Sequence, residues 1–134
     1  MKISIITLFP EVFDPILNTS ILKRAQAKGK VTFELINLRD FGEGKHQVVD
    51  DRPYGGGVGM VLKADILSRT LNSIINPSQN TKKTKFKIKN LKLKIVLMSA
   101  SGKSFKQKMA LDLSKLYHLI LICGHYEGVD QRFI

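Results

Sequence analysis

Short apolar runs alternate along the chain with segments in which apolar residues recur every three or four positions. The apolar runs predict four strands, at residues 3–8, 31–38, 95–98 and 118–123. The segments with helical spacing predict three helices, at residues 10–28, 63–75 and 105–116. Because strands that alternate with helices form parallel sheets, the pattern indicates an α/β fold with a doubly wound, mostly parallel sheet.

Two short loops follow predicted strands directly, one at Ser99–Gly102 and the other at Gly124–Gly128. Ligands of open α/β sheets bind in the crevice at the carboxyl ends of the strands, where both loops are expected. The second loop presents the carboxylate of Glu127 and the amphipathic ring of Tyr126 between two glycines, which permit a sharp turn. A plain surface turn explains the same residues equally well.

A cluster of four glycines within five positions lies in the long polar segment from Arg39 to Gly59. Glycine loses more backbone freedom on folding than any other residue, so such a cluster needs a local reason. Acidic, basic and aromatic side chains come directly before it, in Asp50–Tyr54. This composition is typical of a loop whose backbone approaches a ligand closely, and a solvent-exposed connector is the alternative.

The charge of the chain is strongly unbalanced. Lys and Arg number 22 against 11 Asp and Glu, which gives a net charge of +11 in 134 residues. Such a charge favours polyanions, most often nucleic acid, although a merely soluble basic protein is also compatible with it. Lysines crowd residues 82–94, where they partly alternate with apolar residues in a weak strand or hairpin pattern. A solvated insertion explains this stretch better than a specific nucleic-acid contact.

Length and cysteine content limit the class of protein further. A chain of 134 residues predicts one domain. Cys123 is the single cysteine, so an intrachain disulfide is impossible and a reducing compartment is expected. The first apolar run meets Pro10 and Glu11 too early for a signal peptide, and no apolar run approaches the roughly 20 residues of a membrane span. The cytoplasm is the expected location, without a membrane partner.

Two other groups of residues are compatible at first sight with a phosphate-binding loop and a metal site. Ser101–Ser104 follows a strand and precedes a helix like part of a phosphate-binding loop, but Leu97 stands where that motif requires a glycine. A helix N-terminus capped by Ser104 is the better explanation. His46, Asp50 and Asp51 do not match the spacing of a zinc site, so no metal site is predicted.

Three motifs in order resemble one family. They are Thr7–Phe13, Val49–Met60 with its Asp-Asp-Arg-Pro-Tyr-Gly-Gly-Gly core, and Cys123–Asp130. Together they closely resemble the bacterial tRNA (guanine-N1)-methyltransferases, the TrmD family of the SPOUT superfamily. The resemblance covers the chain apart from the lysine-rich stretch near residues 78–94. Ala100 departs from the family pattern, which usually has Pro at that position.

The resemblance implies a fold, an activity and a set of site residues. The expected fold contains a deep trefoil knot, and the expected enzyme is a cytoplasmic homodimer. It transfers a methyl group from S-adenosylmethionine to N1 of the guanine 3′-adjacent to the tRNA anticodon, which maintains the reading frame. The implied donor-binding residues are Leu97, Met98, Ser99, Ala100, Gly102, Gly124, Tyr126, Glu127 and Gly128. The implied tRNA-binding residues are Asp50, Arg52, Pro53, Tyr54, Gly55 and Gly59.

The chemistry also requires a general base for the proton on guanine N1, and a cation or Mg²⁺ near O6. The resemblance places the base downstream of Ile134, so no catalytic residue is predicted in this chain. Residues 1–134 are therefore expected to form a partial methyltransferase domain with an incomplete knot and without the C-terminal tRNA-binding domain. Weak or absent activity is expected of this chain alone. The alternative is a non-catalytic, basic RNA-binding fragment.

Overall fold

The computed structural model describes residues 1–76 and 92–134, which form two compact units. The first unit comprises residues 1–37 and 92–123, and the second comprises residues 38–76 and 124–134.

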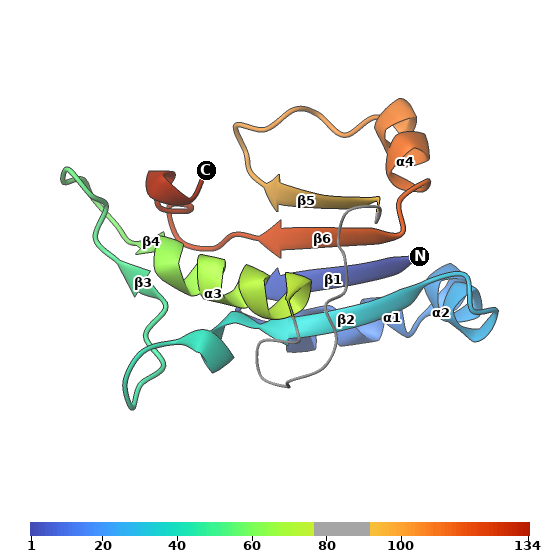
Figure 1. Ribbon diagram of the computed structural model, residues 1–134, viewed down its shortest axis with the longest axis horizontal. Coiled ribbons are helices and arrows are strands. Elements are labelled where there is room, and N and C mark those ends of the chain that lie inside the picture. The colour runs from blue at the N-terminus through green and yellow to red at the C-terminus, as the bar shows by residue number, and fades with distance from the viewer. Residues whose placement is uncertain (77–91) are drawn as a thin grey trace. The chain divides into compact units, whose positions relative to one another are not determined.

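A parallel sheet of four strands forms the centre of the first unit (Figure 1). Its strands are β1 (Lys2–Thr7), β2 (Thr32–Asn37), β5 (Leu93–Met98) and β6 (His118–Cys123), and their order is β2-β1-β6-β5. In the register, Met98 at the end of β5 lies opposite Cys123 at the end of β6. The α/β class, the four strands and their parallel pairing are confirmed.

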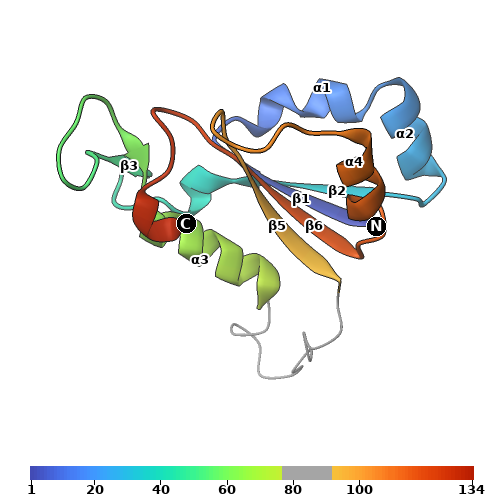
Figure 2. The same cartoon turned by 90° about the horizontal axis from the view of Figure 1, so that it is seen from above.

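The helices of the first unit are shorter than the periodicity predicts. The predicted helix over residues 10–28 consists of a 3₁₀ turn, η1 (Pro10–Val12), and two helices, α1 (Asp14–Leu17) and α2 (Ser20–Ala27). The break follows Asn18, whose side-chain amide donates to the carbonyl and the carboxylate of Asp14. Both helices lie over one face of the sheet (Figure 2). Gly29, at φ +64°, follows the end of α2, a position and conformation that favour glycine.

The helix between β5 and β6 corrects one prediction. It is α4 (Gln107–Leu113), whereas the apolar spacing predicts residues 105–116. Ser104 does not cap it, because the residue before the first helical turn is Lys106, and no side chain caps that end. Polar residues and lysines dominate the segment just before Gln107, so periodicity alone places the start of this helix too early.

The second unit contains a two-stranded antiparallel hairpin, a helix and two 3₁₀ turns. These are η2 (Leu38–Phe41), β3 (Asp50–Asp51), β4 (Val61–Leu62), α3 (Ala64–Ile75) and η5 (Gln131–Phe133). The predicted helix at residues 63–75 is confirmed as α3, which contacts η2 and η5. The buried apolar residues of this unit are Leu38, Val49, Val61, Leu62, Ile66 and Leu67. The short hairpin interrupts what the sequence indicates as one long polar segment.

Part of the sequence prediction lies outside the described residues. The strand, hairpin or insertion considered for residues 78–94 falls almost entirely in the stretch from 77 to 91, and Leu93 and Lys94 begin β5. Among the described helices, none has the length and apolar character needed to cross a bilayer.

A buried polar network joins three strands of the first unit near their amino ends. The hydroxyl of Ser4 in β1 donates to Glu34 of β2 at 2.7 Å, and Ser4 Oγ lies 2.9 Å from His118 Nε2 of β6. Lys2 forms an ion pair with Glu34 at 2.9 Å. Because the single hydroxyl hydrogen of Ser4 is used toward Glu34, His118 Nε2 is the donor to Ser4 Oγ.

The network sets the protonation of its members. Burial lowers the pKa of His118, and the charge of Lys2 lowers it further, against the opposing charge of Glu34. Burial raises the pKa of Glu34, but the hydrogen bonds from Ser4 and Lys2 and the charge of Lys2 bring it below its ordinary value. The fold therefore favours a neutral His118 beside an ionised Glu34.

This network predicts a stability change in mild acid. Since the folded state lowers the pKa of His118, the unfolded chain binds the proton more readily, and the free energy of unfolding should fall as the pH drops below about 6.5. Glu34 titrates at lower pH and does not contribute in this window. His118→Gln retains a donor toward Ser4 and should flatten the dependence between pH 7 and pH 5. Urea titrations at several pH values measure the free energy of unfolding. The same dependence on pH in the unaltered protein and in His118→Gln would contradict the lowered pKa of His118.

Candidate functional site

Main-chain hydrogen bonds join the glycine-rich segment of the second unit to the segment that follows β6. Glu127 N donates to Met60 O, Leu62 N donates to Gly128 O, and Asp130 N donates to Leu62 O, each at 3.0 Å. Leu62 and Val129 accordingly form a parallel bridge beside the β3–β4 hairpin. Two segments that are distant in sequence are thus fixed to each other by backbone geometry.

Gly59 and Glu127 meet where these two segments join. A Cβ atom at Gly59 would lie 2.3 Å from Cγ of Glu127, so the position admits no side chain while Glu127 keeps its place. Gly59 also has φ +90°, a conformation that favours glycine. A residue expected to bind tRNA and a residue expected to bind the methyl donor are therefore in direct contact.

The four clustered glycines all adopt positive φ. The angles are +92° at Gly55, +87° at Gly56, +137° at Gly57 and +90° at Gly59. Residues with side chains rarely adopt these angles, so the cluster specifies a defined backbone path. The path leaves Tyr54 and Val58 in solvent, with exposed fractions of 83% and 97%.

The polar residues before the glycines are held at the base of the loop. Asp50 lies opposite Leu62 in the hairpin, and the carboxylate of Asp51 accepts a hydrogen bond from Arg52 N at 2.7 Å. Pro53 O accepts a hydrogen bond from Gly56 N at 3.1 Å, which closes a turn around Tyr54. The predicted tRNA-binding residues thus lie in β3 and in the loop that joins β3 to β4.

The segment after β6 contains two residues with positive φ. Tyr126 has φ +59° and Gly128 has φ +129°. The rings of His125 and Tyr126 are 4.8 Å apart in an edge-to-face arrangement. Nothing lies within 4 Å of a Cβ built on Gly128, so it is the φ angle at this position that favours glycine.

An ion pair joins Asp130, the last residue of the third motif, to Arg132, which lies outside the motifs. The guanidinium of Arg132 bonds to both carboxylate oxygens of Asp130, with Nη2 at 2.6 Å and Nε at 3.0 and 3.2 Å. These hydrogen bonds bring the pKa of Asp130 down to about 2. Arg132 Cζ lies over the ring of Tyr54, 4.9 Å from its centroid. The spacing of Asp130 and Arg132, two positions apart, is a sequence signal for their ion pair. The contact of Arg132 with Tyr54 has no such signal, because the two residues are distant in the chain.

The loop after β5 borders an open pocket of about 300 Å³ in the first unit. Four predicted donor-binding residues line it, namely Leu97, Met98, Ser99 and Gly102. Ala100 does not line it. Gly102 N donates to Ser99 O at 3.1 Å, and a Cβ at Gly102 would lie only 3.0 Å from that oxygen, so glycine suits the turn. The predicted turn at Ser99–Gly102 is confirmed.

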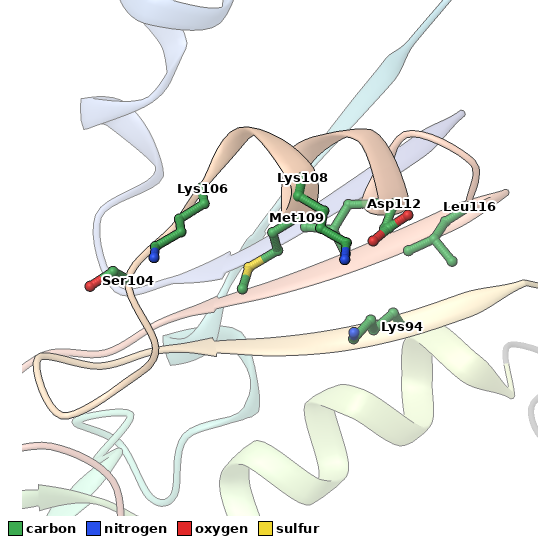
Figure 3. Close-up of a pocket in the computed structure, with 8 residues that line it drawn as sticks. Lys94, Ser104, Lys106, Lys108, Met109, Asp112 and Leu116 are labelled. Atoms are coloured by element: carbon green, nitrogen blue, oxygen red, sulfur yellow. The ribbon is translucent and has the colours of Figure 1, made fainter.

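A second pocket, of about 430 Å³, adjoins the first between α4 and β5 and shares Lys94, Met109 and Leu113 with it. Figure 3 shows the side chain of Met109 beneath α4, with the lysines at positions 94, 106 and 108 around it. The pocket therefore combines an apolar floor with a mostly basic rim.

The two predicted donor-binding segments belong to different units. Leu97–Gly102 lies in the first unit and Gly124–Gly128 in the second. The described residues hold no group of three His, Cys, Asp or Glu side chains that could bind a metal ion.

The parallel four-stranded sheet places the first unit in the open α/β class, whose ligands bind at the carboxyl ends of the strands. A family model described as tRNA (Guanine-1)-methyltransferase TrmD matches residues 1–134. The chain belongs to this family, which confirms the resemblance found in its motifs.

Individual relatives agree with the family assignment. The chain is 46% identical over 132 residues to the tRNA (guanine-N(1)-)-methyltransferase of Anoxybacillus flavithermus, a match that covers 98% of this chain and 49% of that protein. Over the same length it is 48% identical to the enzyme of the same description from Macrococcus caseolyticus, again covering 98% and 49%. With the enzyme of Carboxydothermus hydrogenoformans the identity is 47%, and the coverage is 98% and 47%. The chain spans about half the length of the curated relatives it matches.

The contact between Gly59 and Glu127 predicts that a side chain at position 59 destabilises the fold by a clash. A side chain at position 55 is the matched control without that clash. Gly59 and Gly55 have φ of +90° and +92°, but no atom lies within 4 Å of a Cβ at Gly55. Gly55→Ala should cost about 1 kcal/mol of strain. Gly59→Ala should cost roughly 1 kcal/mol more, because Glu127 must move. Thermal unfolding of both variants measures the difference.

Removing the side chain of Glu127 should remove this difference. In a Glu127→Ala background, Gly59→Ala and Gly55→Ala should lower the melting temperature by the same amount. Equal losses in the unaltered background would show that the contact does not constrain position 59.

Proposed function

We propose that this chain forms the donor-binding part, and part of the guanine-binding surface, of an enzyme that methylates tRNA. The reaction transfers a methyl group from S-adenosylmethionine to N1 of the guanine 3′-adjacent to the anticodon. The observation that carries the proposal is the joining of Met60–Leu62, which directly follows the glycine-rich loop, to residues 127–130 by three main-chain hydrogen bonds. This joins residues expected to bind the donor to residues expected to bind the guanine.

The residues of the first unit suit the adenosine portion of the donor. Leu97, Met98 and Phe105 give the pocket apolar walls. Main-chain groups of the Ser99–Gly102 turn can form hydrogen bonds with the polar edge of the adenine. Ala100 would contribute through its main chain. The volume of about 300 Å³ lies at the lower end of the range for small-molecule pockets.

The segment after β6 suits the charged end of the donor. Bound S-adenosylmethionine supplies a methyl group on a positively charged sulfur. The carboxylate of Glu127 would stabilise a positive charge, either that of the sulfonium or that of the amino group. Tyr126 would pack against the ligand, while Gly124 and Gly128 allow the backbone to approach it.

The glycine-rich loop would hold the guanine and its neighbouring nucleotides. Asp50 and Arg52 offer an acceptor and a donor for base edges or phosphate, and Tyr54 offers a stacking surface. Pro53, Gly55 and Gly59 set the path of the backbone. The net charge of +11 favours attraction to tRNA over a long range.

The proton on guanine N1 must be removed before N1 becomes an effective nucleophile. Asp130 is unsuited to this role, because its pKa of about 2 makes it a very weak base at neutral pH. In keeping with the family resemblance, we propose that the general base lies outside residues 1–134. Closure of the trefoil knot, the homodimer and a role for Mg²⁺ belong to the same proposal for the complete enzyme.

The test of donor binding is calorimetric titration of the chain with S-adenosylmethionine and with its demethylated product. Saturable binding at one site is expected. Glu127→Ala should weaken binding of the methyl donor about tenfold, through loss of a charge-assisted contact. Glu11→Ala removes the same charge from the exposed turn η1 and serves as the matched control. Absence of binding at millimolar ligand would contradict the proposal for this chain.

Methyl transfer by the chain alone should be weak or undetectable, since the general base is placed outside it. Incorporation of a labelled methyl group into tRNA measures this. Turnover at the rate of a complete enzyme would overturn the placement of the base.

A second candidate is a basic fragment that binds RNA without turnover, and the lysine-rimmed pocket between α4 and β5 favours it. Such binding should weaken steeply with salt and show little preference among RNAs. A strong preference for tRNAs with a guanine beside the anticodon would count against this candidate.

A further inference from the structure

We propose that Asp130 and Arg132 are positioning residues that hold the ring of Tyr54 as a stacking platform for an unstacked RNA base. The inference rests on the proposed function and assigns a role to two residues outside the expected site. Its geometric basis is a continuous arrangement of a carboxylate, a guanidinium and an aromatic ring within the second unit.

The guanidinium is fixed before any ligand arrives. Asp130 accepts hydrogen bonds from the side chain of Arg132 and, at 2.9 Å, from its backbone N–H. Asp130 is itself only 6% exposed, and its own N–H donates to Leu62 O. An arginine held by both carboxylate oxygens keeps the plane of its guanidinium defined.

The fixed guanidinium lies over a ring that its own loop supports poorly. Three glycines follow Tyr54 directly, so the next side chain along the chain is that of Val58, which points into solvent. Arg132 Cζ lies 4.9 Å from the centroid of the Tyr54 ring, yet Tyr54 remains 83% exposed. The contact therefore orders the ring while leaving most of it available.

An exposed aromatic ring backed by a cation is suited to stacking with a nucleobase. Unstacked bases of RNA loops bind on aromatic rings and on arginine planes, and every base offers a π-face. Here the ring of Tyr54 would lie between Arg132 and the base. The ion pair with Asp130 neutralises Arg132, so stacking rather than phosphate attraction is the expected contribution.

The experiment uses the 134-residue chain and a stem-loop RNA with the sequence of a tRNA anticodon arm. 2-Aminopurine replaces one loop base at a time, because its fluorescence is quenched on stacking. In the unaltered protein, at least one loop position should show additional quenching on binding. Arg132→Lys keeps the charge but loses the planar group, and it should remove this quenching and weaken binding about fivefold to tenfold.

Variants separate stacking from charge and from general damage. Tyr54→Leu should behave like Arg132→Lys, and the double variant should be no weaker than either single one. Tyr54→Phe keeps the ring and should keep the quenching. Arg69→Lys is the matched control, because Arg69 is likewise paired with acids, at Glu43 and Asp65, on the same unit.

The free protein provides a readout that does not depend on RNA. Nuclear magnetic resonance of chains with labelled tyrosine should show the ring signals of Tyr54 shifting in Arg132→Lys and Asp130→Asn, and staying in place in Arg69→Lys. Unchanged ring signals would overturn the positioning role whether or not RNA binds.

The two failures are distinguishable. If the chain binds both ligands, but Arg132→Lys binds RNA with full affinity and quenching, the inference fails and the proposed function stands. If the unaltered chain binds neither the stem-loop nor S-adenosylmethionine, the proposed function fails and the stacking role falls with it.

Discussion

The candidate site depends on hydrogen bonds between main-chain groups of Met60–Leu62 and of residues 127–130. Buried backbone groups must find partners, and here each segment supplies what the other lacks. The bonds fix the base of the glycine-rich loop, bring Glu127 against Gly59, and place Asp130 where it can hold Arg132. Because backbone atoms make these contacts, the side chains on the two loops remain available for ligands.

Much of the first unit follows from local pattern. The four strands are short apolar segments, and their parallel pairing follows from the helices between them. Helix ends were less predictable. The apolar spacing over residues 10–28 is weakened at Asn18–Ser20, and there the Asn18 side chain bonds to the preceding turn and the helix breaks. The apolar spacing over residues 105–116 includes Phe105, although α4 begins only at Gln107 and Ser104 caps nothing. Periodicity reports which face is apolar and carries little information on where capping occurs.

The site was only partly visible in the sequence. The four glycines of residues 55–59 do adopt angles that disfavour side chains, which explains their clustering. Strands β3 and β4, each of two residues, are too short for an alternating pattern to indicate them. The sequence did not predict a role for Arg132, because its partner Tyr54 is distant in the chain and the contact forms only on folding. The expected site residues came from the family motifs, because periodicity carries no information on them.

The contact between Gly59 and Glu127 has a thermodynamic consequence. A ligand that orders one of the two joined segments also restricts the other, so the entropy of ordering is lost once rather than twice. For the two ligands proposed above, the second would bind more tightly than it would alone, and the coupling is reciprocal by necessity. Two chemically different ligands would in this way change each other's affinity through a few peptide groups, without any change in the fold.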